Sequence, residues 1–194
     1  MPEATNSRLR QPHLETARCI VRPALPTDLA TLLAAVQSPL FPRRLPLAQM
    51  AMSDELAPWL ARMCSRSSEG SAFLWSIELR DGGRCIGQIS LSPKPGSTAW
   101  ALAFWLDPTH WGRGIAVEAV SRVNEAAFSL LSMQELWAGV ALWNQRSFTT
   151  LERLGFRLLG VHSSGYWVAG EPEPIRGYHL TRQRWLDNER LHNG

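Results

Sequence analysis

The 194-residue sequence lacks the features that define several large classes of protein. No apolar run approaches the roughly 20 residues of a membrane-spanning helix, and residues 1–13 have no apolar stretch like that of a secretory signal. The three cysteines, Cys19, Cys64 and Cys85, are odd in number and include no C-x-x-C pair. They fit neither a disulfide framework nor a cysteine metal site. We therefore expect a cytoplasmic protein with no bound metal and no membrane contact.

Charge is also scarce. The net charge is only +3, charged residues make up 19% of the chain, and Lys94 is the single lysine. Because there is no basic run and no basic–aromatic interleaving, direct nucleic-acid binding is not expected. Hydrophobic residues, at 45%, suffice for one globular core. We predict a single domain over residues 14–187, preceded by a flexible segment at 1–13 and followed by a tail at 188–194.

What the sequence does contain is a glycine loop, Trp111-Gly-Arg-Gly-Ile-Ala116, between an apparent strand end and the start of a helix. Gly112 and Gly114 allow close approach of the backbone, and the free N–H groups and dipole of the helix start favour an anion such as a pyrophosphate. Similar loops also occur in plain strand–helix connections. The third glycine of the dinucleotide fingerprint and the Gly-Lys-Ser/Thr of the P-loop are both absent, which excludes those two folds.

Hydrophobic periodicity and turn residues predict alternating strands and helices around one sheet. The predicted strands lie at 14–22, 73–79, 85–91, 99–106, 136–142, 156–161 and 176–185, and the predicted helices at 29–36, 53–66, 116–131 and 145–154. Residues 38–46 and 163–174 are predicted to be connecting loops. The order indicates an α+β fold. Trp100 and Trp143 could line a pocket or lie in the core, and the core is the preferred expectation for each.

Four stretches together resemble the GNAT superfamily of acyl-CoA N-acyltransferases, and most of all its RimJ/RimL-type ribosomal-protein N-acetyltransferases. They are Leu14–Pro23, the hairpin with Ile86-Gly87, Phe104–Pro108 with the loop and helix at 111–119, and Asn144–Ser147 with Leu151–Phe156. The resemblance covers about residues 14–185. It implies a single mixed, mostly antiparallel sheet with a central splay and helices on both faces. It also implies acetyl-CoA as cosubstrate, an amine acceptor and a possible homodimer.

The resemblance also assigns roles to residues. The amides of 112–116 would cradle the CoA pyrophosphate, with Arg113 nearby as a charge partner. The strand 103–106 would pair with the pantetheine, and Asn144 would hydrogen-bond its other side. Ser147 would donate to the departing thiolate and is the predicted catalytic residue. The implied cosubstrate-binding set is Phe104, Trp105, Leu106, Trp111, Gly112, Arg113, Gly114, Ile115, Ala116, Asn144 and Ser147.

Two positions depart from the family pattern. Leu151 stands where many of these enzymes have a tyrosine acid, which leaves the role to Ser147 or water. Ala101 stands where the group often has a glutamate facing the substrate. A lysine amine, with a pKa of about 10.4, is only about one part in a thousand neutral at pH 7.4, whereas an α-amine near 7.8 is about a quarter neutral. A site without a strong base therefore favours an α-amine.

The general base stays open between Glu78, His162 and Glu118, although Glu118 in a first helical turn also suits the helix dipole and Glu78 could simply face solvent. Acceptor recognition is expected from the two predicted loops and the second helix.

The aromatic residues predicted to bind the acceptor are Trp59, Tyr166 and Trp167. Arg43 and Arg44 could favour an acidic partner or be solvated surface charges.

The sequence thus predicts an acetyl-CoA-dependent N-acetyltransferase that acts on a primary amine, in particular a protein or peptide N-terminal α-amine. Two alternatives remain. One is a small-molecule amine acetyltransferase, for an antibiotic, a polyamine or an amino acid. The other is a catalytically degenerate module that only binds acyl-CoA.

Overall fold

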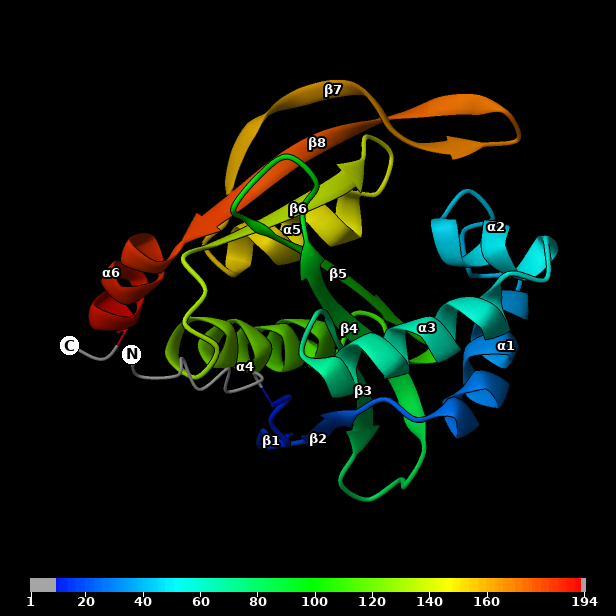
Figure 1. Ribbon diagram of the computed structural model, residues 1–194, viewed down its shortest axis with the longest axis horizontal. Helices are drawn as coiled ribbons and strands as arrows, with labels where there is room; N and C mark the ends of the chain where they lie inside the picture. The colour runs from blue at the N-terminus through cyan, green and yellow to red at the C-terminus, as the bar shows by residue number, and fades with distance from the viewer. Residues whose placement is uncertain (1–9, 193–194) are drawn as a thin grey trace, which may run out of the picture.

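The protein folds around one eight-stranded sheet in the computed structural model, which describes residues 10–192 (Figure 1). The strand order is β1-β2-β3-β4-β5-β6-β8-β7, and every neighbouring pair is antiparallel except β5 and β6. The strands are β1 Leu14–Glu15, β2 Cys19–Pro23, β3 Phe73–Leu79, β4 Cys85–Pro93, β5 Trp100–Leu106, β6 Glu135–Ala141, β7 Arg157–Val168 and β8 Glu171–Thr181.

Helices cover both faces of the sheet. The α-helices are α1 Leu29–Gln37, α2 Pro46–Met52, α3 Leu56–Glu69, α4 Ile115–Ser129, α5 Gln145–Arg153 and α6 Arg182–His192, with short 3-10 turns at Pro26–Asp28 and Pro108–His110. The apolar face of α4 packs in the main core with Trp75, Ile89 and Leu106, whereas α1 and α2 pack on Trp105 from the opposite face. The predicted mixed sheet with helices on both faces is confirmed.

The sheet splits between its two parallel strands. β5 and β6 pair only at Trp100 with Leu136 and Ala101 with Trp137, and then diverge. Beyond the split, β6 continues into Asn144 and α5, while β5 continues into the glycine loop and α4. The predicted central splay is therefore present, and it places the starts of two helices beside the gap.

Three segments differ from the prediction. Residues 46–52 form α2, which starts with Pro46 at its first position, whereas the predicted connection at 38–46 ended there and no element was predicted for 47–52. The predicted loop 163–174 is mostly strand, because the long β7–β8 hairpin pairs Tyr166 with Glu173 across an irregular register that hides the strand pattern. The hairpin reaches toward α2 (Figure 1).

At the C-terminus the predicted strand 176–185 ends at Thr181, and α6 follows to His192. Trp185 of this helix stacks on Phe128 of α4 at 5.5 Å between ring centroids, a tertiary contact that the local sequence does not reveal. The predicted boundary at residue 187 therefore falls inside a helix.

At the other end, residues 1–9 of the predicted flexible segment lie outside the described residues. Gln11 and Pro12 of the same segment bond to β3, at Leu74 and Trp75. Within residues 10–192 no helix is both long and apolar enough to cross a membrane.

Candidate active site

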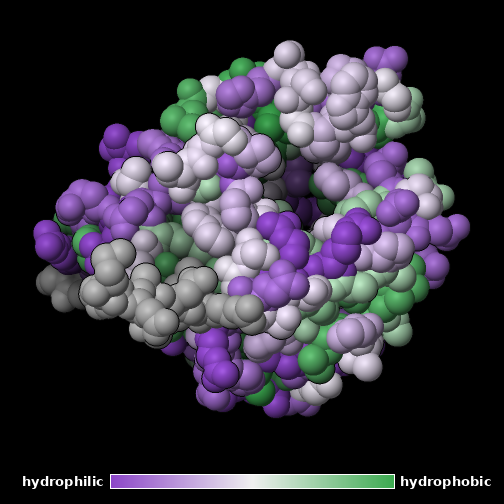
Figure 2. All heavy atoms as spheres, viewed as in Figure 1, coloured by the Kyte–Doolittle hydropathy of each residue, from purple (hydrophilic) through white to green (hydrophobic). Residues whose placement is uncertain are grey.

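Two pockets meet at the split in the sheet. The larger has a volume of about 900 Å³ and the smaller about 290 Å³. Both are lined by Leu45, Phe104, Trp105, Asn144 and Ser147. In the space-filling view the surface is hollowed below the β7–β8 hairpin, between α2 and α5 (Figure 2). A molecule in the larger pocket can thus meet one in the smaller pocket beside Ser147.

The glycine loop forms one wall of the larger pocket. Gly112 and Gly114 have φ angles of 73° and 74°, in the left-handed region that favours glycine, and Gly114 is the N-cap of α4. A Cβ on Gly112 would have no atom within 4 Å, so this part of the loop is open to a ligand. The first N–H groups of a 15-residue helix have no partner within the helix. The loop can therefore accept an anion, as its sequence predicts.

Arg18 anchors this loop from behind. Its Nη1 donates to the carbonyl of Arg113 at 2.7 Å, and its Nε lies 2.6 Å from Glu118 Oε2. Burial raises the pKa of Glu118, but hydrogen bonds from Thr16 and Arg18 outweigh it, so the net pKa is lowered. Glu118 lines neither pocket. Its role is to hold the loop through Arg18, which leaves it unsuited to the general base.

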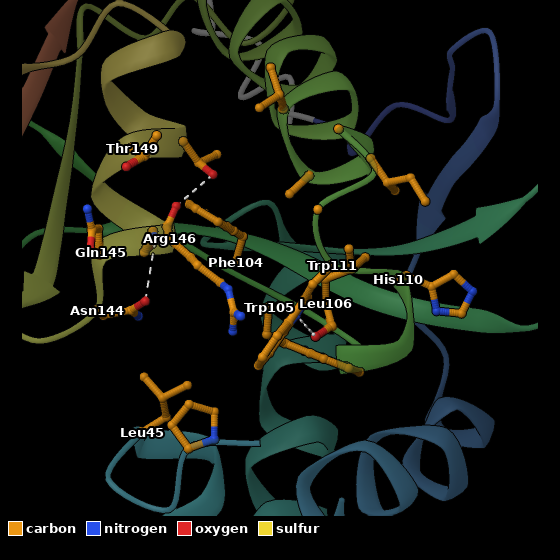
Figure 3. Close-up of a pocket in the computed structure, with 18 of the residues that line it drawn as sticks. Leu45, Phe104, Trp105, Leu106, His110, Trp111, Asn144, Gln145, Arg146 and Thr149 are labelled. Carbon is orange, nitrogen blue, oxygen red and sulfur yellow. Dashed lines mark hydrogen bonds between the residues drawn. The ribbon is translucent and has the colours of Figure 1, made fainter. Parts of the chain in front are cut away.

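Basic side chains from α5 face the same pocket. Arg146 lies over the ring of Trp111, 4.5 Å from its centroid (Figure 3). Arg153, two turns further along the helix, also lines the pocket. Trp111 is fixed because its Nε1 donates to the carbonyl of Leu106 at 2.8 Å. The exposed side chain of Arg113, the charge partner expected from the sequence, is not part of the lining. Arg146 and Arg153 were not predicted, since arginines on a helix read as solvated charges.

Asn144 and Ser147 lie where the two pockets join. Asn144 is the N-cap of α5, and its Oδ1 accepts from the amide of Ser147 at 3.3 Å. Ser147 is half-buried, and in the part of the chain that the structure describes its hydroxyl makes no hydrogen bond to protein. Leu151 is fully buried one turn further on. Ser147 is thus free to donate to a ligand at the junction.

The smaller pocket carries no charged side chain among residues 10–192. Its lining is Leu45, Pro46, Leu47, Met50, Trp59, Leu74, Gln88, Ser90, Leu102, Ala103, Phe104, Trp105, Ala138, Gly139, Val140, Ala141, Asn144, Ser147, Leu151 and Tyr166. Of the three aromatic residues predicted to bind the acceptor, Trp59 and Tyr166 line this pocket, whereas Trp167 is 65% exposed and lines neither pocket. Ala101, the position of the missing glutamate, lies on the same strand just outside this lining.

Tyr166 presents an unused hydroxyl. Its Oη is buried and has no hydrogen-bond partner within residues 10–192. Burial and the nearby charge of Glu173 raise its pKa to about 12. The phenol therefore stays protonated near neutral pH and can donate a hydrogen bond to a ligand, but it cannot serve as a base.

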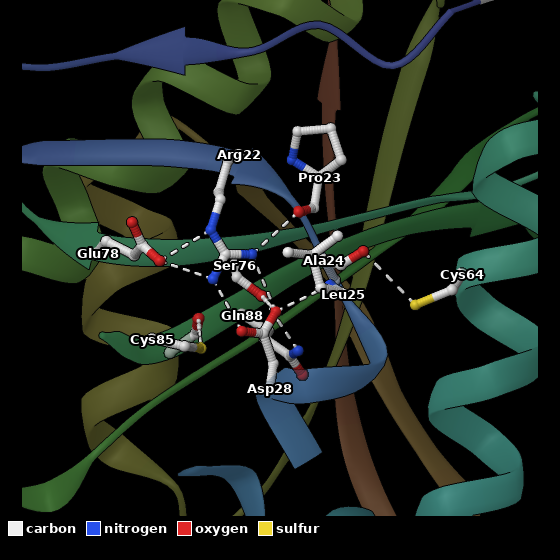
Figure 4. Close-up of polar contacts among 11 residues, drawn as sticks. Arg22, Pro23, Ala24, Leu25, Asp28, Cys64, Ser76, Glu78, Cys85 and Gln88 are labelled. Carbon is white, nitrogen blue, oxygen red and sulfur yellow. Dashed lines mark hydrogen bonds and ion pairs between the residues drawn. The ribbon is translucent and has the colours of Figure 1, made fainter. Parts of the chain in front are cut away.

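Ion pairs lie behind the smaller pocket rather than in it. Arg22 bonds both Asp28, with Nη2 to Oδ1 at 2.8 Å, and Glu78, with Nη2 to Oε1 at 2.6 Å (Figure 4). Burial raises the pKa of Asp28, but hydrogen bonds from Arg22, the Leu25 amide and Ser76 outweigh this effect, so the net pKa falls below its usual value. Glu78, a predicted base candidate, is thus engaged in this cluster.

Gln88 connects that cluster to the pocket. Its Nε2 donates to Ser76 Oγ at 3.3 Å, and its Oε1 accepts from Trp105 Nε1 at 3.2 Å. The third base candidate, His162, is exposed on β7 beside Gly177 and lines neither pocket. The structure therefore brings none of the three candidates to the site. No group of three metal-ligating side chains occurs within residues 10–192.

A second ion pair lies next to residues that line the two pockets. Glu173 of β8 is 2% exposed, and its Oε2 lies 2.7 Å from Arg44 Nη2. Its Oε1 accepts from Trp143 Nε1 at 2.9 Å. Trp143 is 37% exposed and lines the larger pocket, so its predicted place in the core is wrong, whereas Trp100 packs against the main core. Glu173 carried no signal in the sequence, where it stands between two prolines.

A split mixed sheet with a glycine loop and helix start on one side of the gap is the arrangement of an acyl-CoA-dependent N-acyltransferase. The family model of the acetyltransferase (GNAT) domain matches residues 18–157, well over half of the chain. The protein therefore belongs to the GNAT acetyltransferase family, and it is an N-acetyltransferase that uses acetyl-CoA.

Relatives agree with this assignment. An uncharacterized N-acetyltransferase of Bacillus subtilis, YoaA, is 26% identical over 174 residues, which are 89% of this chain and 98% of that protein. RimL, a ribosomal L7/L12 α-N-protein acetyltransferase solved with coenzyme A, superposes with a TM-score of 0.74 at 16% identity, covering 88% of this chain and 98% of that one. A chimera of the spermidine N-acetyltransferase SpeG from Vibrio cholerae and hSSAT reaches 0.71 at 14% identity, covering 88% and 99%. These two structures share the fold but differ in the acceptors that they are named for.

Proposed function

We propose that this enzyme transfers acetyl directly from acetyl-CoA to the N-terminal α-amine of a protein or peptide. The observation that carries the proposal is the smaller pocket, which within residues 10–192 has no carboxylate, imidazole or cation in its lining. A primary amine must be neutral to attack a thioester. Because an α-amine is about a quarter neutral at pH 7.4 and a lysine or polyamine amine about one part in a thousand, a pocket without a base favours the α-amine.

The larger pocket suits the cosubstrate. The amides of the glycine loop and the first turn of α4 can hold the pyrophosphate, and Arg146 and Arg153 add positive charge along the same wall. The edge of β5 at Phe104–Leu106 and the side chain of Asn144 border the gap in the sheet and can bond the pantetheine. The acetyl group would then lie at the junction of the pockets.

Ser147 is the residue best placed for chemistry. The amine attacks the thioester carbonyl from the smaller pocket, the C–S bond breaks, and negative charge develops on the sulfur. The free hydroxyl of Ser147 can donate a hydrogen bond to that thiolate, which lowers the barrier because the bond strengthens as charge develops. The proton lost by the amine passes to water at the open mouth.

The spermidine neighbour defines the second candidate acceptor. A polyamine carries further cations beyond the reacting amine, and bringing them into an uncharged pocket costs desolvation energy without a paired carboxylate to offset it. The described lining of the smaller pocket offers no such carboxylate. The lack of a carboxylate in this described lining also weighs against aminoglycosides as acceptors, because they too carry several cations.

A homodimer stays a prediction. The surface that would carry it is the exposed edge of β7, where Leu158, Leu159 and Val161 are 53%, 55% and 63% exposed. An apolar strand edge of this kind is prone to pair with another strand.

The test is release of free thiol from acetyl-CoA with a panel of amines. The panel holds peptides with free N-termini, N-blocked lysine peptides, spermidine and an aminoglycoside. We expect turnover with the free N-termini, and a rate that rises with pH through the pKa of each α-amine. Turnover with spermidine alone would overturn the protein acceptor. Tight binding of acetyl-CoA without turnover of any amine would favour the degenerate binding module.

A further inference from the structure

The Arg44–Glu173 pair sits one side chain behind the acceptor pocket. Glu173 pairs with Tyr166 across the β7–β8 hairpin, and its charge contributes to the raised pKa of Tyr166. Tyr166 lines the smaller pocket, and Trp143, which donates to the same carboxylate, lines the larger. Leu45, next to Arg44, lines both. The carboxylate is therefore close to both pockets but in the lining of neither.

The two partners of this ion pair differ in exposure. The Arg44 side chain is 61% exposed, whereas that of Glu173 is 2% exposed. Both bonds from Arg44, from Nε at 3.1 Å and from Nη2 at 2.7 Å, reach the same oxygen, Oε2. The guanidinium thus covers the solvent side of a buried carboxylate. Its removal would open a path from the mouth of the site to an unpaired negative charge.

We propose that Arg44 is a specificity-determining residue, which keeps the acceptor site uncharged by occupying Glu173. This inference rests on the proposed function, and it names the acceptor class more finely: amines with no second cation near the reacting nitrogen. Without Arg44, the buried carboxylate would retain one neutral donor, the Trp143 indole. Because an unpaired buried carboxylate is costly, it would bind a cationic group of the acceptor in place of the guanidinium.

The pair also explains how an enzyme of this fold can discriminate against polyamines without a repulsive side chain in the pocket. A carboxylate in the wall would attract every polycation in the cell. Arg44, an arginine of the same chain, already pairs with that carboxylate, so that a second cation on the acceptor finds no partner and loses its hydration. In this proposal, specificity depends on whether Arg44 or a cation of the acceptor pairs with the Glu173 carboxylate.

The experiment compares Arg44→Met with Arg43→Met. Arg43 is the exposed neighbour whose side chain makes no hydrogen bond or ion pair within the described residues, so both variants lose one surface charge of the same loop. The readout is the ratio of kcat/KM for spermidine to that for a neutral peptide with a free N-terminus. We expect Arg44→Met to raise this ratio about tenfold, which corresponds to about 1.4 kcal/mol, and Arg43→Met to leave it unchanged.

Two further variants isolate the charge. Adding Glu173→Gln to Arg44→Met should return the ratio to the wild-type value, because the freed carboxylate is gone. Arg44→Lys should keep the wild-type ratio, since it keeps a cation on Glu173. An unchanged ratio in a folded Arg44→Met variant overturns the proposal. If that variant does not fold, Arg44→Gln takes its place with the same expectation.

A binding measurement separates this inference from the proposed function. Calorimetry with spermidine and the CoA-saturated protein needs no turnover. We expect Arg44→Met to bind spermidine about tenfold more tightly than Arg43→Met. Equal affinities of the two variants overturn the role of Arg44 even if the wild-type enzyme acetylates peptides. Failure of the wild type to acetylate any peptide overturns the proposed function, whatever the calorimetry shows.

Discussion

The two pockets that meet at Ser147 handle charge in opposite ways. The larger is lined by a helix N-terminus, Arg146 and Arg153, which leave positive charge open to a ligand. The smaller is lined by uncharged side chains, and the charges around it are paired one layer back, at Arg22 and at Arg44. The contrast supports our proposal that one half of the site binds an anion and that the other half takes a neutral nucleophile.

The difference has a physical reason. Phosphates bring their own charge and stay partly hydrated, so open cations at a pocket mouth gain attraction without deep burial. An amine nucleophile loses reactivity when protonated, and a carboxylate beside it would favour the protonated form. Pairing each carboxylate with an arginine removes that effect. The predictions below disturb first the uncharged half, then the junction, then the anion half.

The largest effect is expected from Asp28→Asn, beneath the floor of the smaller pocket. Asp28 is 5% exposed and bonds Arg22 through both oxygens. The asparagine leaves Arg22 with Glu78 as its carboxylate partner, and breaking a buried pair costs about 3 kcal/mol of unfolding free energy at pH 7. Urea denaturation measures the loss. As a matched control, Asp187→Asn, at an exposed pair with Arg190, should cost about 0.5 kcal/mol or less.

The same pair has a definite pH dependence. The pKa of Asp28 is lowered in the folded state. The contribution of Asp28 to the free energy of unfolding is therefore fully present above about pH 4, and it is lost as the pH falls through the folded-state pKa. The stability gap between wild type and Asp28→Asn should therefore be constant from pH 7 to about 5 and shrink in more acidic solution. A gap that grows in acid would contradict this assignment.

At the junction, Ser147→Ala should lower kcat by about 100-fold, the lower end for loss of a proton or hydrogen-bond donor to a reacting atom. Because the Asn144 cap accepts from the backbone of residue 147 and not from its side chain, the helix start is preserved. Calorimetry should show nearly unchanged acetyl-CoA affinity. An unaltered kcat would assign protonation of the thiolate to water.

Local sequence patterns located the residues that line the larger pocket better than those around the smaller one. Gly112, Gly114, Asn144 and Ser147 lie in two short motifs, each at the start of a helix, so the features that position them are adjacent in the chain. The ion pair of Arg44 joins residues 129 positions apart. No periodicity of one segment encodes such a pairing.

Glu173 shows why the surroundings of the smaller pocket could not be predicted from the sequence. Prolines at 172 and 174 and the glycines at 165 and 170 predicted a loop, yet pairing of the long hairpin overrides the local preference. The three base candidates were chosen from residue type and element alone. Two of them form ion pairs with arginines from β2 or the segment before it, a partnership that depends on tertiary contacts.

In the anion half, Gly114→Val should weaken acetyl-CoA binding about tenfold. A β-branched residue at φ 74° is strained by roughly 1–3 kcal/mol, so the loop shifts and its amides no longer converge. Gly96→Val is the matched control, because Gly96 has φ 68° in the β4–β5 turn, away from both pockets. Both variants should lose stability, but only Gly114→Val should lose affinity. Equal affinities would remove the loop from cosubstrate binding.

The smallest effect is expected from Arg146→Ala, about fivefold in acetyl-CoA affinity, or about 1 kcal/mol for one partly exposed cation over Trp111. Because solvent-exposed charge is screened, the loss should shrink between about 0.05 M and 0.5 M salt. Acetyl-pantetheine, which lacks the phosphates, should bind both forms equally. Arg190→Ala on α6 removes the same charge outside the lining of either pocket and should leave affinity unchanged. A loss that persists with acetyl-pantetheine would mean that Arg146 acts by packing rather than by charge, and the contrast between the two pockets would then rest on the helix N-terminus alone.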